Sequence, residues 1–216
     1  MKLPKNYLER LDSKEVYSLS KFVVEENFNH HTEKEGVQNI NSDILSVYEE
    51  EIKYVQNSQI FVCKNDSGNI TGSIRVLKWN YIDRLPIQTL FGINPFLTLQ
   101  GAPLHEIWHI GRFAINKNIK DSSLFKKLMV CAIAPILTHK DNIAFAECDK
   151  KLLRVMSLLG IKAKVVGKSI QYLGSETVPV SFSYEGLIGF YENNKHLVES
   201  YILPEYPNET KNYTFV

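Results

Sequence analysis

A nine-residue apolar segment, followed at once by a polar, amide-rich loop, most constrains what this chain can fold into. Residues 107–115 read Ile-Trp-His-Ile-Gly-Arg-Phe-Ala-Ile, which is typical of a buried strand, and residues 116–123 read Asn-Lys-Asn-Ile-Lys-Asp-Ser-Ser. The apolar run that comes next has helical spacing and predicts a helix over 122–138. Unpaired N–H groups and the helix dipole favour negative charge at a helix start. This junction therefore predicts an anion-binding site.

The composition limits the class of protein. With 216 residues and 44% hydrophobic residues, the chain can bury the core of one domain spanning 1–216. A formal net charge of +1 argues against a dedicated nucleic-acid-binding protein. No apolar run is long enough for a membrane span, and the N-terminus lacks the hydrophobic segment of a secretion signal, so we expect a cytoplasmic protein. Cys63, Cys131 and Cys148 lie far apart, which predicts free, mostly buried thiols and no metal site.

Hydrophobic periodicity predicts alternating helices and strands. A capping box at Asp12 and Glu15 opens the first helix, Asp149 caps a short helix, Gly160 ends that helix, and Pro135 kinks or ends the helix over 122–138. The stretch 78–103 is expected to be irregular, with one short helical turn near 89–91. The order predicts an α/β fold in which helices cover both faces of a mixed sheet. Further helices are expected from 41–42 onward and over 150–159 and 186–202, and strands over 60–63, 70–77, 105–115, 143–148, 161–166 and 178–184.

Four segments resemble one group of enzymes. Residues 108–115, Trp-His-Ile-Gly-Arg-Phe-Ala-Ile, are similar to the Trp-Glu-x-Ser-Arg-Phe-x-Val strand of acyl-homoserine-lactone synthases and long-chain N-acyl amino acid synthases. Residues 148–161, with Val166-Gly167 after them, resemble the same enzymes' strand, helix and Gly-Trp corner. Residues 72–77 and 85–91 resemble their Gly-x-x-Arg-Leu strand and Leu-Pro-Leu-Glu loop. The resemblance spans about residues 58–185 and implies the Gcn5-related N-acyltransferase (GNAT) fold, with a largely antiparallel central sheet.

The resemblance implies a function as well. It implies an N-acyltransferase that moves a fatty acyl group from an acyl carrier protein or coenzyme A thioester to the amine of a small polar acceptor, such as an amino acid. An excess of basic residues near the junction fits docking of an acidic acyl carrier protein, and a solvated lysine face is the alternative. These residues are Lys126, Lys127, Lys150, Lys151, Arg154, Lys162, Lys164 and Lys168. The acyl-phosphopantetheine or acyl-coenzyme A arm is expected on Ala114, Ile115, Lys117, Lys120, Ser122 and Ser123, although a polar loop that only caps the helix would look the same.

The chain departs from this family at three places. His109 stands where the family has Glu, and residues 116–123 contain no glycine, unlike the phosphate loop of ordinary acetyltransferases. The homoserine-lactone branch holds S-adenosylmethionine with an N-terminal arginine and tryptophan, whereas this chain has only Arg10 and no tryptophan before residue 75. Two alternatives therefore stay open. One is an acyl-homoserine-lactone synthase that uses S-adenosylmethionine, and the other is a catalytically silent protein that binds acyl donors or a partner as a sensor.

Attack of an amine on a thioester requires a group that takes a proton. Two residues of this chain are candidates for that role. His109 could take it directly, since imidazole accepts protons near neutral pH, and an inert buried histidine is the alternative. Glu106 reaches the same site only if a bulge or twist intervenes, and the resemblance implies a bulge that splays strand 105–115 from its neighbour. Arg75 and Arg112 lie on apolar strands, so each should meet a carboxylate or bind the substrate's anion.

Two further expectations concern the shape of the site. The segment 87–99 is rich in large apolar residues for an irregular stretch, which fits either an acyl-chain tunnel or a loop packed onto the sheet. Acyl transfer also requires a cleft between the fourth and fifth strands that admits a thioester-bearing arm and reaches the helix starting near Ser122. Tyr172 could return a proton to the leaving thiolate.

Overall fold

The computed structural model describes residues 6–31, 40–99, 101, 103–172 and 175–203. The N-terminal residues 1–5, which bear on the expected absence of a secretion signal, lie outside this part. The strands are β1 (Asn6–Arg10), β2 (Ser58–Asn65), β3 (Ile70–Lys78), β4 (Ile107–Ile115), β5 (Ile143–Asp149), β6 (Lys164–Val165), β7 (Ile170–Tyr172) and β8 (Ser175–Ser183). The α-helices are α1 (Val16–His31), α2 (Ile40–Tyr54), α3 (Pro86–Phe91), α4 (Pro95–Thr98), α5 (Leu124–Ile133), α6 (Lys150–Leu158) and α7 (Tyr184–Asn194).

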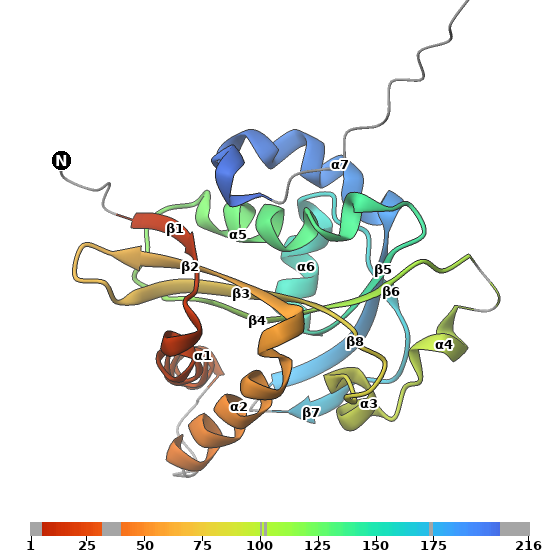
Figure 1. Cartoon of the computed structure of the whole chain (residues 1–216), viewed down its shortest axis with the longest axis horizontal. Helices are drawn as coiled ribbons and strands as arrows, with labels where there is room; N and C mark the ends of the chain where they lie inside the picture. The colour runs from red at the N-terminus through yellow and green to blue at the C-terminus, as the bar shows by residue number, and fades with distance from the viewer. Residues whose placement is uncertain (1–5, 32–39, 100, 102, 173–174, 204–216) are drawn as a thin grey trace, which may run out of the picture.

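The strands form one sheet in the order β1-β2-β3-β4-β5-β8-β6, with β7 paired to β8. Among the described strands, β4 and β5 are the parallel pair, and the other pairs are antiparallel. Helices α1 and α2 cover one face of the sheet, and α5, α6 and α7 cover the other (Figure 1). The predicted mixed, largely antiparallel sheet between two layers of helices is therefore confirmed.

The core lies on both sides of the sheet because both faces are covered. Strand β3 is buried from Thr71 to Leu77, as expected for a strand that contacts helices on each face. The larger cluster lies beneath α5 and α7 and includes Ile74, Leu128 and Phe190, each at most 2% exposed. A second cluster, on the α2 and α3 side, surrounds Leu77 and Phe145. All three cysteines are buried and free.

The predicted helix boundaries rest on local signals that the structure confirms. Helix α5 ends at Ile133, two residues before Pro135, which cannot donate a helical hydrogen bond. The Asp149 side chain accepts a hydrogen bond from the backbone N–H of Leu152 at 2.8 Å and so caps α6. Gly160 follows this helix with φ +88°, a left-handed conformation that glycine adopts without steric cost. Within the described residues, no helix is long and apolar enough to cross a membrane.

The prediction was less accurate where elements are short. The stretch expected to be irregular contains α3 and α4, because Pro86 and Pro95 occupy the first position of each helix, where a missing N–H costs nothing. The strand expected over 161–166 is only the two-residue β6, and edge strands β1 and β7 were not predicted. The predicted helix over 186–202 is α7 followed by two 3-10 turns over 195–197 and 200–202.

Two glycines of α7 give opposite stability predictions. A Cβ at Gly186 would lie 2.5 Å from the backbone oxygen of Lys162, which cannot move freely because the Lys162 N–H donates to Gly186 O at 2.9 Å. We expect Gly186→Ala to lower the free energy of unfolding by about 1–3 kcal/mol. Nothing lies within 4 Å of a Cβ at Gly189, so Gly189→Ala should raise the free energy of unfolding by about 0.5–1 kcal/mol. Urea denaturation of both variants checks this, and a shift of the same sign in both would contradict the packing described.

Candidate active site

Strands β4 and β5 separate halfway along their length. Their pairing runs from Ile107–Ile143 to His109–Phe145 and ends there. Beyond that point, residues 110–115 of β4 and 146–149 of β5 line a cleft with a volume of about 490 Å³. The cleft also contacts Phe125 and Met129 of α5. A cleft that reaches the helix after Ser122 is therefore present, as predicted. It lies between the strands predicted over 105–115 and 143–148, which are the third and fourth predicted strands and become β4 and β5 because β1 was not predicted.

A β-bulge accompanies this separation. Ser73 of β3 faces Ala114 of β4, and Arg75 faces Gly111, so two residues of β4 oppose the single residue between Ser73 and Arg75. Arg112, the first of the two bulged residues, has φ +53°, a left-handed conformation that is uncommon for a residue with a side chain. The implied bulge in this strand is thus present, and it lies beyond His109.

The cleft passes through the sheet from one helical layer to the other. At one end it is lined by side chains from α1, α2 and α3, among them Val24, Glu50 and Leu90. At the other end it is lined by α5 and α6, with Phe125 and Leu152. Two substrates could therefore enter from opposite faces and meet between the strands.

A buried ion-pair network forms the wall of the cleft on the α2 side. The fully buried Glu51 of α2 receives hydrogen bonds on Oε1 from Arg75 Nη1 and from Arg112 Nε, the latter at 2.7 Å. Arg112 Nη2 also lies 2.9 Å from Glu50 Oε2. Burial raises the pKa of Glu50, but the Arg112 and Arg75 guanidinium groups outweigh it, so this pKa lies below its ordinary value. The prediction that each guanidinium meets a carboxylate or an anion is confirmed.

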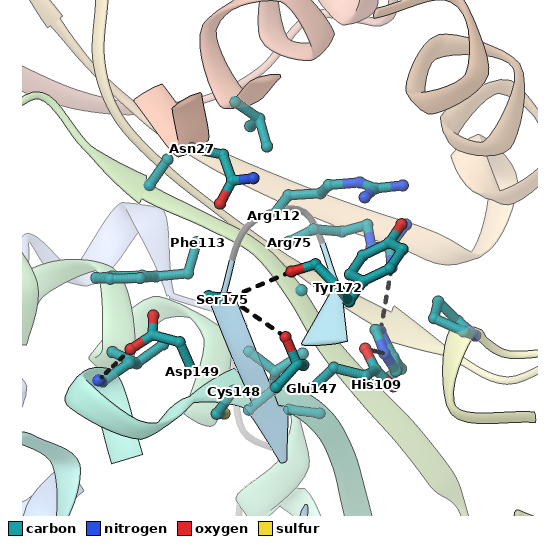
Figure 2. A pocket seen from close by; sticks show the side chains of 18 of the residues that line it. Asn27, Arg75, His109, Arg112, Phe113, Glu147, Cys148, Asp149, Tyr172 and Ser175 are labelled. Carbon is teal, nitrogen blue, oxygen red and sulfur yellow. Dashed lines mark hydrogen bonds and ion pairs between the residues drawn. The ribbon is translucent and has the colours of Figure 1, made fainter. Parts of the chain in front are cut away.

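His109 lies in the middle of the cleft wall, 1% exposed, and both of its ring nitrogens are engaged. Nδ1 lies 3.1 Å from Arg75 Nη2, and Nε2 lies 2.9 Å from Glu147 Oε2 (Figure 2). Glu147 is on β5, where the two strands part, and 11% of its side chain is exposed. Among the described residues, its other oxygen, Oε1, is buried and has no hydrogen-bond partner.

Glu106 lies apart from this group. Its carboxylate pairs with the half-exposed Lys78 instead, and it is not among the residues that line the cleft. The bulge follows His109 rather than separating the two residues, so the strand's alternation keeps their side chains on opposite sides. Arg75, Arg112 and His109 are brought together in the cleft, and Glu106 is not.

The residues expected to hold the donor divide in the same way. Ala114 and Ile115 line the cleft, whereas Lys117, Lys120 and Ser122 are exposed on the loop outside it. Ser123 is occupied locally, because its N–H and hydroxyl donate to Asp121 Oδ1 at 2.8 and 2.6 Å. Asp121 thus stabilises the turn before α5, whose N-cap residue, Ser123, has no side-chain capping bond.

Other polar groups of the cleft have restricted roles. Burial raises the pKa of the Cys148 thiol far above its ordinary value, helped by the neighbouring carboxylates of Glu147 and Asp149, so this thiol is a poor nucleophile. Burial likewise raises the pKa of Tyr172, which lines the cleft and stays protonated as a proton donor must. Of the apolar segment 87–99, Leu90 and Thr89 line the cleft, while Ile87 is buried in the core.

Sequence reasoning missed the carboxylates. Glu51 is one of three consecutive glutamates on a helix, and nothing local distinguishes it from its exposed neighbour Glu49. Glu147 did carry a signal, because it is the one charged residue in the otherwise apolar run Ile-Ala-Phe-Ala-Glu-Cys. A charged residue on a buried strand calls for a partner or a function.

Known structures share this architecture, although no protein-family model and no curated protein sequence matches the chain. FeeM, an N-acyl amino acid synthase from uncultured soil microbes, is 13% identical with a TM-score of 0.60, over 90% of this chain and 99% of FeeM. The acyl-homoserine-lactone synthase LasI is 16% identical with a TM-score of 0.51, over 87% and 94%. A GNAT-family acetyltransferase from Staphylococcus aureus is 12% identical with a TM-score of 0.52, over 83% and 99%. The splayed β4–β5 pair, the sheet order and these likenesses together show that this chain has the GNAT fold.

Proposed function

We propose that this protein is an N-acyltransferase that moves an acyl group from a coenzyme A or acyl carrier protein thioester to the amine of a small polar acceptor, such as an amino acid. The observation that carries the proposal is the cleft between β4 and β5, which is lined by residues from both helical layers and has a buried imidazole–carboxylate pair in its wall. A long thioester arm from one side and an amine from the other would meet beside that pair.

The cleft offers the groups that this reaction needs. Past His109, no described strand pairs with β4 on its β5 side, so backbone groups of residues 110–114 on that side can meet the amides and the thioester carbonyl of the donor. The lining near α5 and α6 includes Phe125, Met129 and Met156, an apolar surface suited to an acyl chain. Tyr172 would protonate the leaving sulfur.

Basic residues border the donor end of the cleft. Lys151 of α6 lines it, and the exposed Arg154 lies on the same helix. These cations favour either the phosphates of coenzyme A or the surface of an acidic acyl carrier protein. They also offer a donor site in place of Lys117, Lys120 and Ser122, which lie outside the cleft.

One incubation tests the proposal against its alternatives. The purified protein is given acyl carrier protein or coenzyme A loaded with acyl chains of different lengths, together with a pool of amino acids, with and without S-adenosylmethionine, and the products are identified by mass spectrometry. We expect N-acyl amino acids that form without S-adenosylmethionine. An acyl-homoserine lactone that forms only with it would identify a lactone synthase. Donor binding without any product would identify a sensor.

A further inference from the structure

We propose that Glu147, rather than His109, takes the proton from the acceptor amine, and that His109 is the residue that positions Glu147. This inference rests on the proposed acyl transfer and assigns the base within the same cleft. The sequence pattern had placed this role on His109. The geometry points to Glu147 because of where the hydrogens of the three contacting groups must lie.

The tautomer of His109 follows from its partner on β3. A guanidinium has only hydrogen-bond donors, so Arg75 Nη2 donates to His109 Nδ1 across their 3.1 Å contact, and Nδ1 carries no proton. The remaining nitrogen, Nε2, therefore bears the hydrogen and donates it to Glu147 Oε2 at 2.9 Å. The lone pair of Nδ1 and the N–H of Nε2 are therefore both used by protein groups. His109 has no free lone pair to offer an amine.

Glu147 has the capacity that His109 lacks. Glu147 lines the cleft. One of its oxygens is held by His109, while the other is buried and has no hydrogen-bond partner among the described residues. A buried acceptor without a partner is costly and marks a place where a ligand's donor is expected. An alkylammonium group supplies that donor. The positive charge of Arg75 is already paired with Glu51. Arg75 therefore does not cancel the negative charge of Glu147 through the hydrogen-bonded series Arg75–His109–Glu147.

Gly111 leaves the space that the contact between His109 and Arg75 needs. A Cβ at this position would lie 3.0 Å from His109 Cε1 and 3.1 Å from Arg75 Nη2, tighter than ordinary contacts between fully buried groups. The glycine two residues after His109 on β4 thus leaves room for the imidazole and the guanidinium to touch. The carboxylate of Glu147 lies on the opposite strand, β5.

The proposed reaction converts an ammonium group and a thioester into an amide and a free thiol. Glu147 Oε1 takes one proton from the acceptor's ammonium group, and the neutral amine attacks the thioester carbonyl carbon. The new C–N bond forms, the tetrahedral intermediate collapses, and the C–S bond breaks. Tyr172 donates its proton to the leaving sulfur and regains one from the amine nitrogen, and Glu147 returns its own proton to water. The products are an amide and a free thiol, with one proton released.

The test compares two glutamine variants and two amines, using the full chain with whichever thioester supports turnover. Glu147→Gln keeps an acceptor for His109 but cannot take a proton, so kcat for an alkylamine should fall about 100-fold or more while the donor KM stays unchanged. With a methoxyamine acceptor, which is already neutral at pH 7, we expect the loss to shrink to about tenfold or less, since no base is needed. His109→Gln retains an N–H that reaches Glu147, and its kcat should fall only about tenfold.

Several outcomes would overturn this assignment. It is wrong if His109→Gln loses as much activity as Glu147→Gln, or if Glu147→Gln loses as much with methoxyamine as with the alkylamine. If Glu147→Gln does not fold, as judged by circular dichroism, Glu147→Ala with added formate replaces it, and failure of formate to restore any turnover counts against the base. Absence of transfer by the unmodified protein with every thioester would instead refute the proposed function.

Discussion

Replacing Glu51 by alanine is expected to lower the free energy of unfolding by about 3–5 kcal/mol, because it leaves two buried guanidinium groups without their shared carboxylate. Glu51 is fully buried and bridges Arg75 and Arg112, of which Arg75 is 1% exposed. Arg112 would retain its ion pair with Glu50. Arg75 would keep its contact with His109, the ring of Tyr54 with its centroid 5.1 Å from the guanidinium carbon, and the more distant charge of Glu50. Urea denaturation followed by circular dichroism measures the change.

The matched control removes a glutamate, Glu192, whose ion pair is exposed to solvent. Glu192 pairs with Lys195 at 2.6 Å on the surface, with about half of each side chain exposed. Solvent screens such a pair, so Glu192→Ala should leave the unfolding curve nearly unchanged. Equal destabilisation by both variants would mean that burial of the Glu51 network has no special energetic role.

A bulky residue at the donor end of the cleft is expected to abolish most acyl transfer. Val155 of α6 lines the cleft and is 41% exposed, so an indole at this position can enter the cleft without disturbing the core. Displacing the thioester by about 1 Å is enough to cost about 100-fold in rate, and we expect Val155→Trp to lower kcat/KM for the donor by about that factor. Single-turnover transfer, measured alongside thermal unfolding, separates a blocked site from a misfolded protein.

Leu158 provides the control on the same helix. It is 78% exposed and is not among the residues that line the cleft. Leu158→Trp introduces the same side chain one turn away and should leave kcat/KM within about twofold of the unmodified protein. Similar losses in the two variants would show that the effect arises from α6 itself and not from the cleft.

The regular elements were predictable because their signals are local. Asp149 and Gly160 mark the two ends of α6, and Pro135 marks the end of α5, through hydrogen bonds and backbone angles set within a few residues. The apolar run over 107–115 alone predicts the strand β4. Short strands were predicted less well: β1 and β7 were not predicted, and β6 was predicted too long. These strands are fixed by the neighbour they pair with and not by their own pattern.

The cleft was predictable only through the resemblance. Nothing in the residues of β4 states that its pairing with β5 stops at His109, because that depends on the bulge at Arg112. An arginine at positive φ has no signature in a sequence, unlike a glycine. The family likeness supplied this long-range feature, and the residues themselves supplied the strand that carries it.

The partners within the site could not be predicted, since they are far apart in the chain. Glu51 lies 24 residues from Arg75, His109 lies 34 residues from Arg75, and Glu147 lies 38 residues from His109. A polar loop also does not reveal which way its side chains point. The donor site was predicted on Ala114, Ile115 and four residues of the loop after them. Ala114 and Ile115 line the cleft, Lys117 and Lys120 do not, and α6 contributes lining residues that were not predicted.

The proposed function requires that a thioester-bearing arm lie between β4 and β5. A crystal structure of the protein with a non-hydrolysable thioether analogue of acyl-pantetheine tests it most directly. We predict that the pantetheine chain lies between residues 110–115 and 146–149, with the acyl carbonyl beside the His109–Glu147 pair. An analogue bound elsewhere, or strands paired along their whole length with no room for a ligand, would contradict the account.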